Sequence, residues 1–211
     1  MQIDLSKPFF RAHGLPRSRP ILESWARVCR RYRDRADAQG DRVCYYNERA
    51  QTGFLAAATW LSGGVALEEW CTEKRSKDGH CRKGRGDLWL QRKNLRLHIE
   101  AKHAWIGLGS QAEANIQKVK AKLAKAQGDA CDISCSRRER RVGVLFAVPI
   151  VRRAAAADAE HRLKQWIAGL QNLDCLALAA AFDPAELDRS GTDELVLGIA
   201  LLIGRATRSP R

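Results

Sequence analysis

The sequence has no long hydrophobic segment. None of its stretches reaches the roughly 20 consecutive apolar residues that a membrane-spanning helix needs, and the longest apolar run, residues 195–204, is predicted to be a buried strand. The first residues lack the charged start and long apolar core of a secretory signal peptide. We therefore expect no membrane partner and a cytoplasmic location, with export by a route that reads no N-terminal signal left open.

Regularly spaced cysteines are also missing. The seven cysteines form no C-x2-C pair, and their odd number argues against a disulfide framework. The nearest metal-ligand spacings are His80-Cys81 and Cys131-x3-Cys135, with Cys71 upstream. Structural zinc sites draw on closer ligand pairs, so we expect reduced, mostly buried thiols instead.

Several catalytic signatures are absent. The sequence contains no P-loop, no GxSxG, no HExxH and no dinucleotide-binding glycine pattern. Its five histidines are scattered without metal-ligand spacing. The enzyme classes that depend on those motifs are therefore not indicated.

Acidic residues are few relative to basic ones. Lys and Arg number 37 against 24 Asp and Glu, which gives a net charge of +13 and a pI near 9.8. Such a balance attracts polyanions, and nucleic acid is the leading candidate partner. The alternative is a basic protein whose charge only aids solubility.

Residues 1–40 are predicted to form a basic N-terminal helical extension. Pro20 is suited to open a helix, and apolar residues at helical spacing follow it up to Gly40, which breaks the pattern. The other face of this helix carries Arg27, Arg30 and Arg31. That face is either a phosphate-contacting arm or a solvated surface.

Residues 41–211 are predicted to form one compact α/β domain. Asn47 caps a helix that ends at Gly63 and Gly64, and Ser110 with Glu113 forms a capping box for a helix that Gly128 stops. Strands are expected at residues 65–74, 87–91, 95–102, 140–151, 173–182 and 194–203, a polar turn at 75–86, and a further helix at 158–170. This order implies a central mixed β-sheet flanked by helices.

The two strands around residues 87–102 place charged side chains on one face. Because strand side chains alternate, Leu95, Leu97 and Ile99 point to the core. The opposite face then receives two sets of side chains: Arg96, His98, Glu100 and Lys102 from the second strand, and Asp87, Trp89 and Gln91 from the first. A two-residue turn at Lys93-Asn94, or a four-residue loop, puts Asp87 opposite Glu100; a three-residue loop contradicts the apolar alternation.

Two opposed carboxylates repel each other. Lys102 neighbours Glu100 on the same face and reduces that repulsion. A divalent cation between the carboxylates reduces it further, since Mg²⁺ favours one or two carboxylates together with water and phosphate.

Gly86-Asp87, twelve intervening residues and Glu100-Ala101-Lys102 resemble the motif of the PD-(D/E)xK nuclease superfamily. That superfamily includes many restriction enzymes, junction resolvases and recombination exonucleases, and its core runs helix, three strands, helix, strand. The resemblance covers residues 47–151, about half of the chain, and implies a restriction-endonuclease-like fold. Gly86 stands where the superfamily name has proline.

The resemblance implies a metal-dependent nuclease, with DNA as the expected substrate. The implied catalytic residues are Asp87, Glu100 and Lys102. The implied ligands of Mg²⁺, or of Mn²⁺ in its place, are Asp87, Glu100 and Glu48. The carbonyl of Ala101 is an implied further ligand. Lys102 either helps to deprotonate the attacking water or balances negative charge. Glu68 and Glu69 are expected on opposite faces of their strand, and either one is a candidate to join the site.

A set of polar and basic side chains is predicted to contact nucleic acid: Arg96, His98, Gln91, Lys118, Lys122, Arg27, Arg30 and Arg31. The alternatives are a satisfied surface histidine at position 98 and a solvated face for the lysines. Trp89 is expected to line the substrate groove.

Two other functions stay open. One is a nucleic-acid-binding or assembly protein that keeps the fold and does not cut. The other is an interaction protein that uses an exposed edge of the apolar strand at residues 195–204. The oligomeric state is open, a homodimer included.

Overall fold

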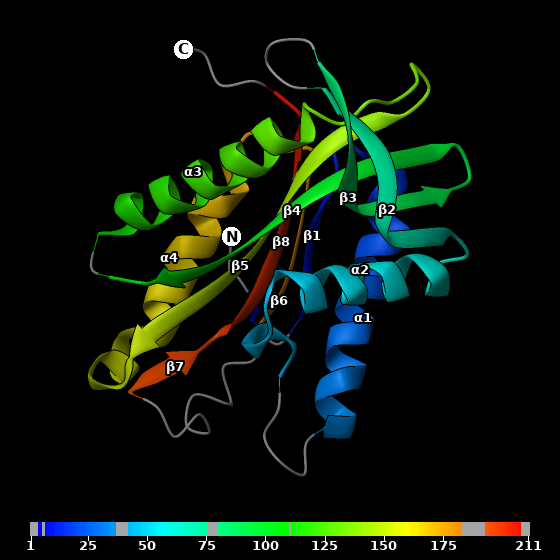
Figure 1. The fold of residues 1–211 in the computed structure, drawn as a ribbon. Coiled ribbons are helices and arrows are strands. Elements are labelled where there is room, and N and C mark those ends of the chain that lie inside the picture. The colour runs from blue at the N-terminus through cyan, green and yellow to red at the C-terminus, as the bar shows by residue number, and fades with distance from the viewer. Residues whose placement is uncertain are drawn as a thin grey trace.

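The computed structural model describes residues 4–5, 7–36, 42–75, 80–109, 111–182 and 193–207, and these form an α/β structure around one large mixed sheet (Figure 1). The strand order is β1-β6-β8-β5-β4-β3-β2, and β7 pairs with β5. Only β4 and β5 run parallel; the other pairs are antiparallel. The strands are β1 (Phe9–Arg11), β2 (Val65–Arg75), β3 (Cys81–Arg92), β4 (Leu95–Gly107), β5 (Arg140–Arg152), β6 (Ala177–Phe182), β7 (Glu194–Val196) and β8 (Gly198–Arg205).

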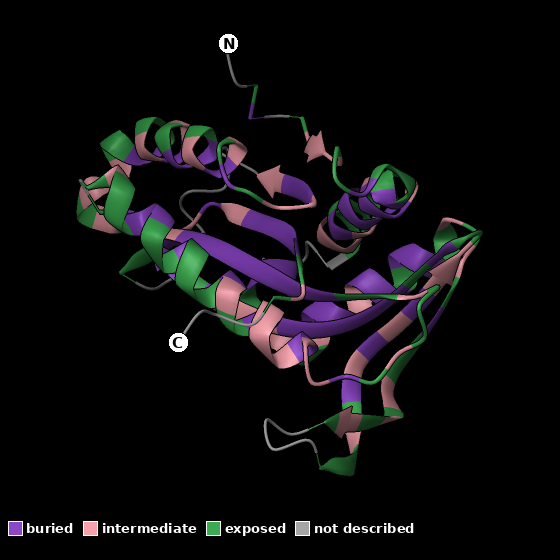
Figure 2. Cartoon of the chain, turned by 90° about the horizontal axis from the view of Figure 1, so that it is seen from above, coloured by how far each residue is buried: buried purple, intermediate pink, exposed green. Residues whose placement is uncertain are grey.

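Two pairs of helices cover the two faces of this sheet, as Figure 2 shows by the buried central strands between them. The described residues include four α-helices: α1 (Arg19–Ala36), α2 (Glu48–Leu61), α3 (Ala112–Ala130) and α4 (Ala159–Gln171). α1 and α2 pack with Leu97, Ile99 and Phe146 in one core cluster. α3 and α4 pack with Leu145 and Ala147 in the other. The predicted mixed sheet flanked by helices is therefore confirmed.

The order helix, three strands, helix, strand predicted for residues 47–151 is observed as α2, β2, β3, β4, α3 and β5. Asn47 caps α2 by accepting a hydrogen bond from the backbone N–H of Ala50 at 3.2 Å. The chain leaves that helix through Gly63, whose φ of +80° is easily adopted only by glycine. The predicted order of helices and strands in residues 47–151 therefore agrees with the structure.

The register of the β3–β4 hairpin is the predicted one. Arg92 pairs with Leu95 across the two-residue turn Lys93-Asn94. Pairing between the strands ends at Leu88 and Ile99, one step before Asp87 and Glu100. Beyond that point β4 pairs with β5 alone, so its other edge is free from residue 100 onward.

Four local expectations were wrong. Residues 81–86 belong to strand β3 instead of a turn, because they pair with β2 along its whole outer half. α3 continues through Gly128 to Ala130, and its N-cap residue is Gln111, whose side chain makes no cap; Ser110 lies outside the described residues. Strand β1 was not predicted. The strand expected at 173–182 begins only at Ala177.

The last predicted strand is two strands. The chain adopts a φ of +131° at Gly198, which separates β7 from β8. β8 lies between β6 and β5 in the interior of the sheet. β8 therefore has no free edge. β7, which holds the start of the same run, pairs with β5 alone among the described strands, so the interaction-protein hypothesis stays a prediction.

The first helix shares the main core. Leu22 and Trp25 of α1 are fully buried in the same cluster as the sheet residues. The break at Gly40 lies outside the described residues, and the division of the chain at residue 40 stays a prediction.

Two further expectations concern membranes and thiols. Within the described ranges, no helix has both the length and the apolar composition needed to cross a bilayer. All seven cysteines are free, but only Cys29 and Cys44 are buried, and Cys71 and Cys81 are exposed on the β2–β3 hairpin. The expectation of mostly buried thiols was therefore wrong.

Candidate active site

The free edge of β4 carries two carboxylates in place of a neighbouring strand. Asp87 Oδ2 accepts a hydrogen bond from the backbone N–H of Ala101 at 2.7 Å. Two residues further, Glu48 Oε2 accepts one from the N–H of His103 at 3.1 Å. Because buried backbone donors must be paired, these contacts fix both carboxylates beside the segment that holds Glu100 and Lys102.

A backbone distortion in β2 opens the sheet at the same point. Glu69 has a φ of +50°, which is unusual for a residue with a side chain. The ladder between β2 and β3 skips it, pairing Glu68 with Leu88 and then Trp70 with Gly86. Asp87 is therefore without a ladder partner on either side, and its side chain turns to β4.

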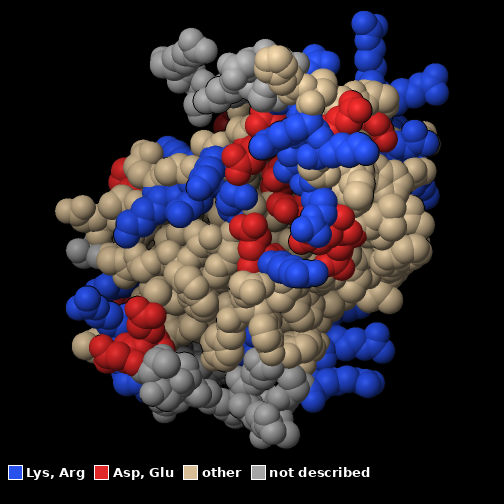
Figure 3. All heavy atoms as spheres, viewed as in Figure 1, with Lys and Arg blue, Asp and Glu red and all other residues tan. Residues whose placement is uncertain are grey.

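The distortion also changes where the glutamates of β2 point. Glu68 and Glu69 were predicted to lie on opposite faces, but the left-handed conformation at Glu69 breaks the alternation and both line one small pocket. Asp87 lines this pocket too. Its remaining lining residues are Glu48, Arg49 and Thr52 of α2. Figure 3 shows acidic side chains gathered on this face between α3 and the β2–β3 hairpin, bordered by basic ones.

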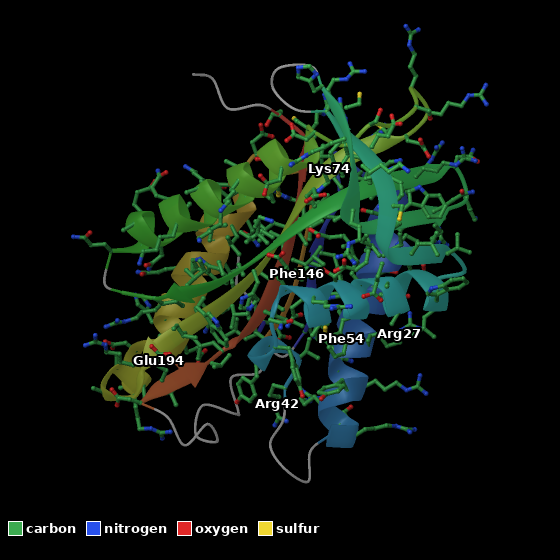
Figure 4. The ribbon with its side chains drawn as sticks, in the orientation of Figure 1. Arg27, Arg42, Phe54, Lys74, Phe146 and Glu194 are labelled. Atoms are coloured by element: carbon green, nitrogen blue, oxygen red, sulfur yellow. The ribbon has the colours of Figure 1, made fainter. Side chains whose placement is uncertain are left out.

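Glu100 is buried, with 5 % of its surface exposed. Its Oε1 atom lies 2.7 Å from Nζ of Lys74, which reaches it from β2. Figure 4 shows Lys74 where β2 passes beside the end of α3. Burial raises the pKa of the Glu100 carboxyl to about 7, and the Asp87 charge adds to this rise while Lys74 opposes it.

Lys102 lies at the centre of a group of oxygens. Its Nζ donates to the Ala101 carbonyl at 2.7 Å and lies 3.2 Å from Oδ2 of Asp129 and 3.9 Å from Oε1 of Glu48. Burial lowers its pKa, but the charges of Glu48, Asp129 and Asp87 outweigh this and hold the pKa of Lys102 above its ordinary value. The side chain is therefore a fixed cation at neutral pH.

The glycine at position 86 has a packing reason. A Cβ atom there would lie 2.6 Å from the indole nitrogen of Trp70, closer than atoms approach. The Trp70 ring also packs on His98 with ring centres 4.8 Å apart. Trp70 therefore leaves no room for a side chain at position 86.

The donor set of the site fits Mg²⁺. Its oxygens are hard ligands, and one or two carboxylates with water and phosphate satisfy this ion. Asp87 and Glu100 are close enough for the charge of Asp87 to raise the pKa of Glu100. In the described part of the chain, no group of three or more His, Cys, Asp and Glu side chains is arranged to hold a metal ion.

The other predicted binding residues lie in three places. Arg96 is exposed and donates to Oε1 of Gln91 at 3.1 Å, whereas His98 is buried, so the alternative of a surface histidine was wrong. Lys118 and Lys122 are exposed on α3. Arg27, Arg30 and Arg31 are exposed on α1, which covers the other sheet face; Figure 4 shows Arg27 well away from Lys74.

Two residues of the site were missed. Lys74 lies near the end of β2, and nothing in the sequence around it indicates a contact with Glu100. Asp129 was detectable, because a carboxylate in the last turn of a helix opposes the helix dipole and invites a compensating cation, here Lys102.

The chain has no match among protein-family models, curated proteins or solved structures.

Proposed function

We propose that this protein is a metal-dependent nuclease of the PD-(D/E)xK type, with a restriction-endonuclease-like core, that hydrolyses phosphodiester bonds in nucleic acid, with DNA as the expected substrate. The observation that carries the proposal is the end of β3–β4 pairing at Leu88 and Ile99. It brings Asp87, Glu100 and Lys102 together at one free strand edge.

Asp87 and Glu100, with Glu48 beside Asp87 as the third predicted ligand, are the residues that would hold Mg²⁺, or Mn²⁺ in its place. A bound divalent ion supplies polarisation of the attacking water and of the phosphate, and stabilises the leaving oxygen. Glu48 orients this edge through His103 and adds negative charge beside Lys102.

Lys102 is proposed to act as a cation and not as a proton acceptor. Its raised pKa keeps the ammonium protonated, because Glu48 and Asp129 surround it. A protonated ammonium donates to phosphate oxygens and offsets the charge that develops on them in the transition state. Asp129 is proposed as a positioning residue, because it acts through its contact with Lys102.

The net charge of +13 supports a polyanionic substrate. The exposed lysines of α3, Lys118 and Lys122, lie on the helix whose end contacts the site through Asp129. They are proposed to contact phosphates beside the scissile bond.

A specific observation favours a second candidate. Lys74 already neutralises Glu100 at 2.7 Å, as an internal cation. A site whose charges are balanced by the chain itself is compatible with a nucleic-acid-binding protein that keeps this arrangement and does not cut.

The deciding experiment is incubation of the purified protein with plasmid, linear duplex, single-stranded DNA and RNA, each with Mg²⁺ and with chelator. The nuclease proposal predicts cleavage that requires the ion. Binding to all substrates without cleavage in Mg²⁺ or Mn²⁺ would favour the second candidate.

A further inference from the structure

A groove adjoins the carboxylate site on the same face of the β3–β4 hairpin. It is open to solvent and has a volume of about 560 Å³. Trp89, two residues after Asp87, pairs directly with His98, two residues before Glu100. The groove is lined by Leu67, Trp70, Thr72, Glu73, Trp89 and His98 of the sheet and by four residues of the segment after α3.

The outer half of β2 closes one side of this groove. Lys74 forms a bridge with Ile133, the N–H of Arg75 donates to Asp132, and the N–H of Ser134 donates to Glu73. These bonds tie β2 to the segment that follows α3. The groove therefore has a built wall, and Trp70 lies on it.

Aromatic side chains line this groove. The Trp70 ring packs on His98 with ring centres 4.8 Å apart, and Nε2 of His98 lies 3.3 Å from Oε2 of Glu139. The indole nitrogen of Trp70 lies against Gly86 and is closed off from the groove. A flat ligand would therefore bind here by stacking on the rings, with its polar edge toward the open side of the groove.

A second, basic pocket continues from the groove. The two share Cys135, Ser136 and Glu139. The basic pocket is also lined by Arg137, Arg140, Arg141 and Arg205. Arg137, Arg140 and Arg205 are exposed, and among the residues that the structure describes none of the three forms an ion pair with a carboxylate.

We propose that this groove binds an unpaired nucleotide segment, with a base stacked against Trp89 and Trp70 and the adjoining phosphates on Arg137, Arg140 and Arg205. Aromatic faces bind bases only when these are unstacked from a duplex, and arginines supply the electrostatic attraction. This proposal rests on the proposed nuclease function, because that function places the scissile bond at Asp87 and Glu100. Asp87 lies two residues before Trp89 on β3, and Glu100 lies two residues after His98 on β4. It restricts the substrate to single-stranded nucleic acid or to a junction with a single-stranded arm.

The test measures binding in chelator, where no cleavage occurs. The probe is a single-stranded oligodeoxynucleotide with one central 2-aminopurine, whose fluorescence is quenched by stacking, with an oligoribonucleotide and a duplex of the same sequence as further arms. Trp89→Leu is expected to weaken single-strand binding by about 5- to 150-fold, the range of one stacked base, and to relieve the quenching. The matched control is Trp60→Leu, an exposed tryptophan of α2 outside the groove, which is expected to bind as the wild type does.

A second variant covers the case in which Trp89→Leu fails to fold. Arg137→Gln with Arg140→Gln removes two exposed charges and leaves the core intact; it is expected to lower affinity and the salt dependence of binding. Equal affinity of Trp89→Leu and Trp60→Leu would overturn the proposal. If the duplex binds as tightly as the single strand and its 2-aminopurine fluorescence also changes, the groove holds a base extruded from a duplex. That result would overturn the single-strand assignment.

The same data separate this proposal from the nuclease proposal. Single-strand binding that depends on Trp89, without cleavage in Mg²⁺, would support the groove proposal and contradict the nuclease proposal. Metal-dependent cleavage, with binding that is unchanged when Trp89 or the arginines are replaced, would support the nuclease proposal and contradict the groove proposal.

Discussion

The Nζ atom of Lys74 and the Oε1 atom of Glu100 lie 2.7 Å apart, and both side chains are largely buried. The lysine comes from β2 and the glutamate from β4, so β3 separates them in the sheet order. They meet where the paired outer halves of β2 and β3 continue past the end of β3–β4 pairing, and Lys74 there also forms a bridge with Ile133 after α3. Lys74 thus offsets the charge of the carboxylate that is proposed to bind the metal.

Replacing Lys74 with Met should destabilise the protein in chelator at pH 8. Removing one partner of a buried ion pair leaves an uncompensated charge and commonly costs about 3–5 kcal/mol. Urea denaturation measures the loss, and Mg²⁺ should restore part of it by binding the released Glu100. The control is Lys83→Met, an exposed lysine of β3. Equal stability of both variants would show that the Lys74–Glu100 pair contributes nothing.

The stability of the metal-free protein should depend on pH through Glu100. Its pKa is raised from the ordinary 4.5 to about 7 because burial disfavours the charged form. The folded state therefore binds the proton more tightly, and this contribution to stability is full below pH 4.5 and is lost as pH rises through about 7. At ~1.4 kcal/mol per pH unit, the loss amounts to about 3 kcal/mol at most.

The measurement is the difference in unfolding free energy between Glu100→Gln and the wild type, in chelator, at pH 5 and pH 8. Other titrating groups cancel in this difference. Glu100→Gln should gain relative to the wild type as pH rises, although Lys74 loses its counter-ion in the variant. The same difference at both pH values would contradict the raised pKa.

Lys102 should tolerate arginine better than an apolar residue. Its proposed role is a fixed positive charge, which guanidinium retains and Met lacks. Initial cleavage rates of Lys102→Arg and Lys102→Met in Mg²⁺ test this. Rates equally low in both variants, with wild-type affinity for substrate, would favour proton acceptance by the lysine.

The arginines of the two sheet faces should differ in their effect on salt dependence. Binding releases about 0.7 counter-ions per neutralised phosphate on a single strand. Removing Arg137, Arg140 and Arg205 together should reduce the salt slope more than removing Arg27, Arg30 and Arg31 from α1, which covers the other face. Affinity measured from 50 to 300 mM salt gives both slopes, and a larger effect of the α1 variant would place nucleic acid on that helix.

Much of this arrangement was predictable from local patterns. The alternation of Leu95, Leu97 and Ile99 and the even turn at Lys93-Asn94 fix the register, and the register brings Asp87 close to Glu100. The caps at Asn47 and Gly63 fix the helix that carries Glu48. These signals act within a few residues of where they appear.

The rest depends on contacts between distant residues. Alternation placed Glu68 and Glu69 on opposite faces, and the positive φ at Glu69 cancels that rule. His98 was expected at the surface and is buried because β2 folds over it and Trp70 covers it. Lys74 reaches Glu100 only through this folding over, which no sequence spacing indicates.

The most direct test of the account is Mg²⁺-dependent cleavage by the wild type and Glu100→Gln, with Glu160→Gln as the matched control on the exposed surface of α4. Binding of the same substrates is measured in chelator beside it. The nuclease proposal predicts that Glu100→Gln loses cleavage by about 100-fold or more while it keeps nucleic-acid binding, and that Glu160→Gln cuts as the wild type does. Equal cleavage rates for Glu100→Gln and the wild type would contradict it.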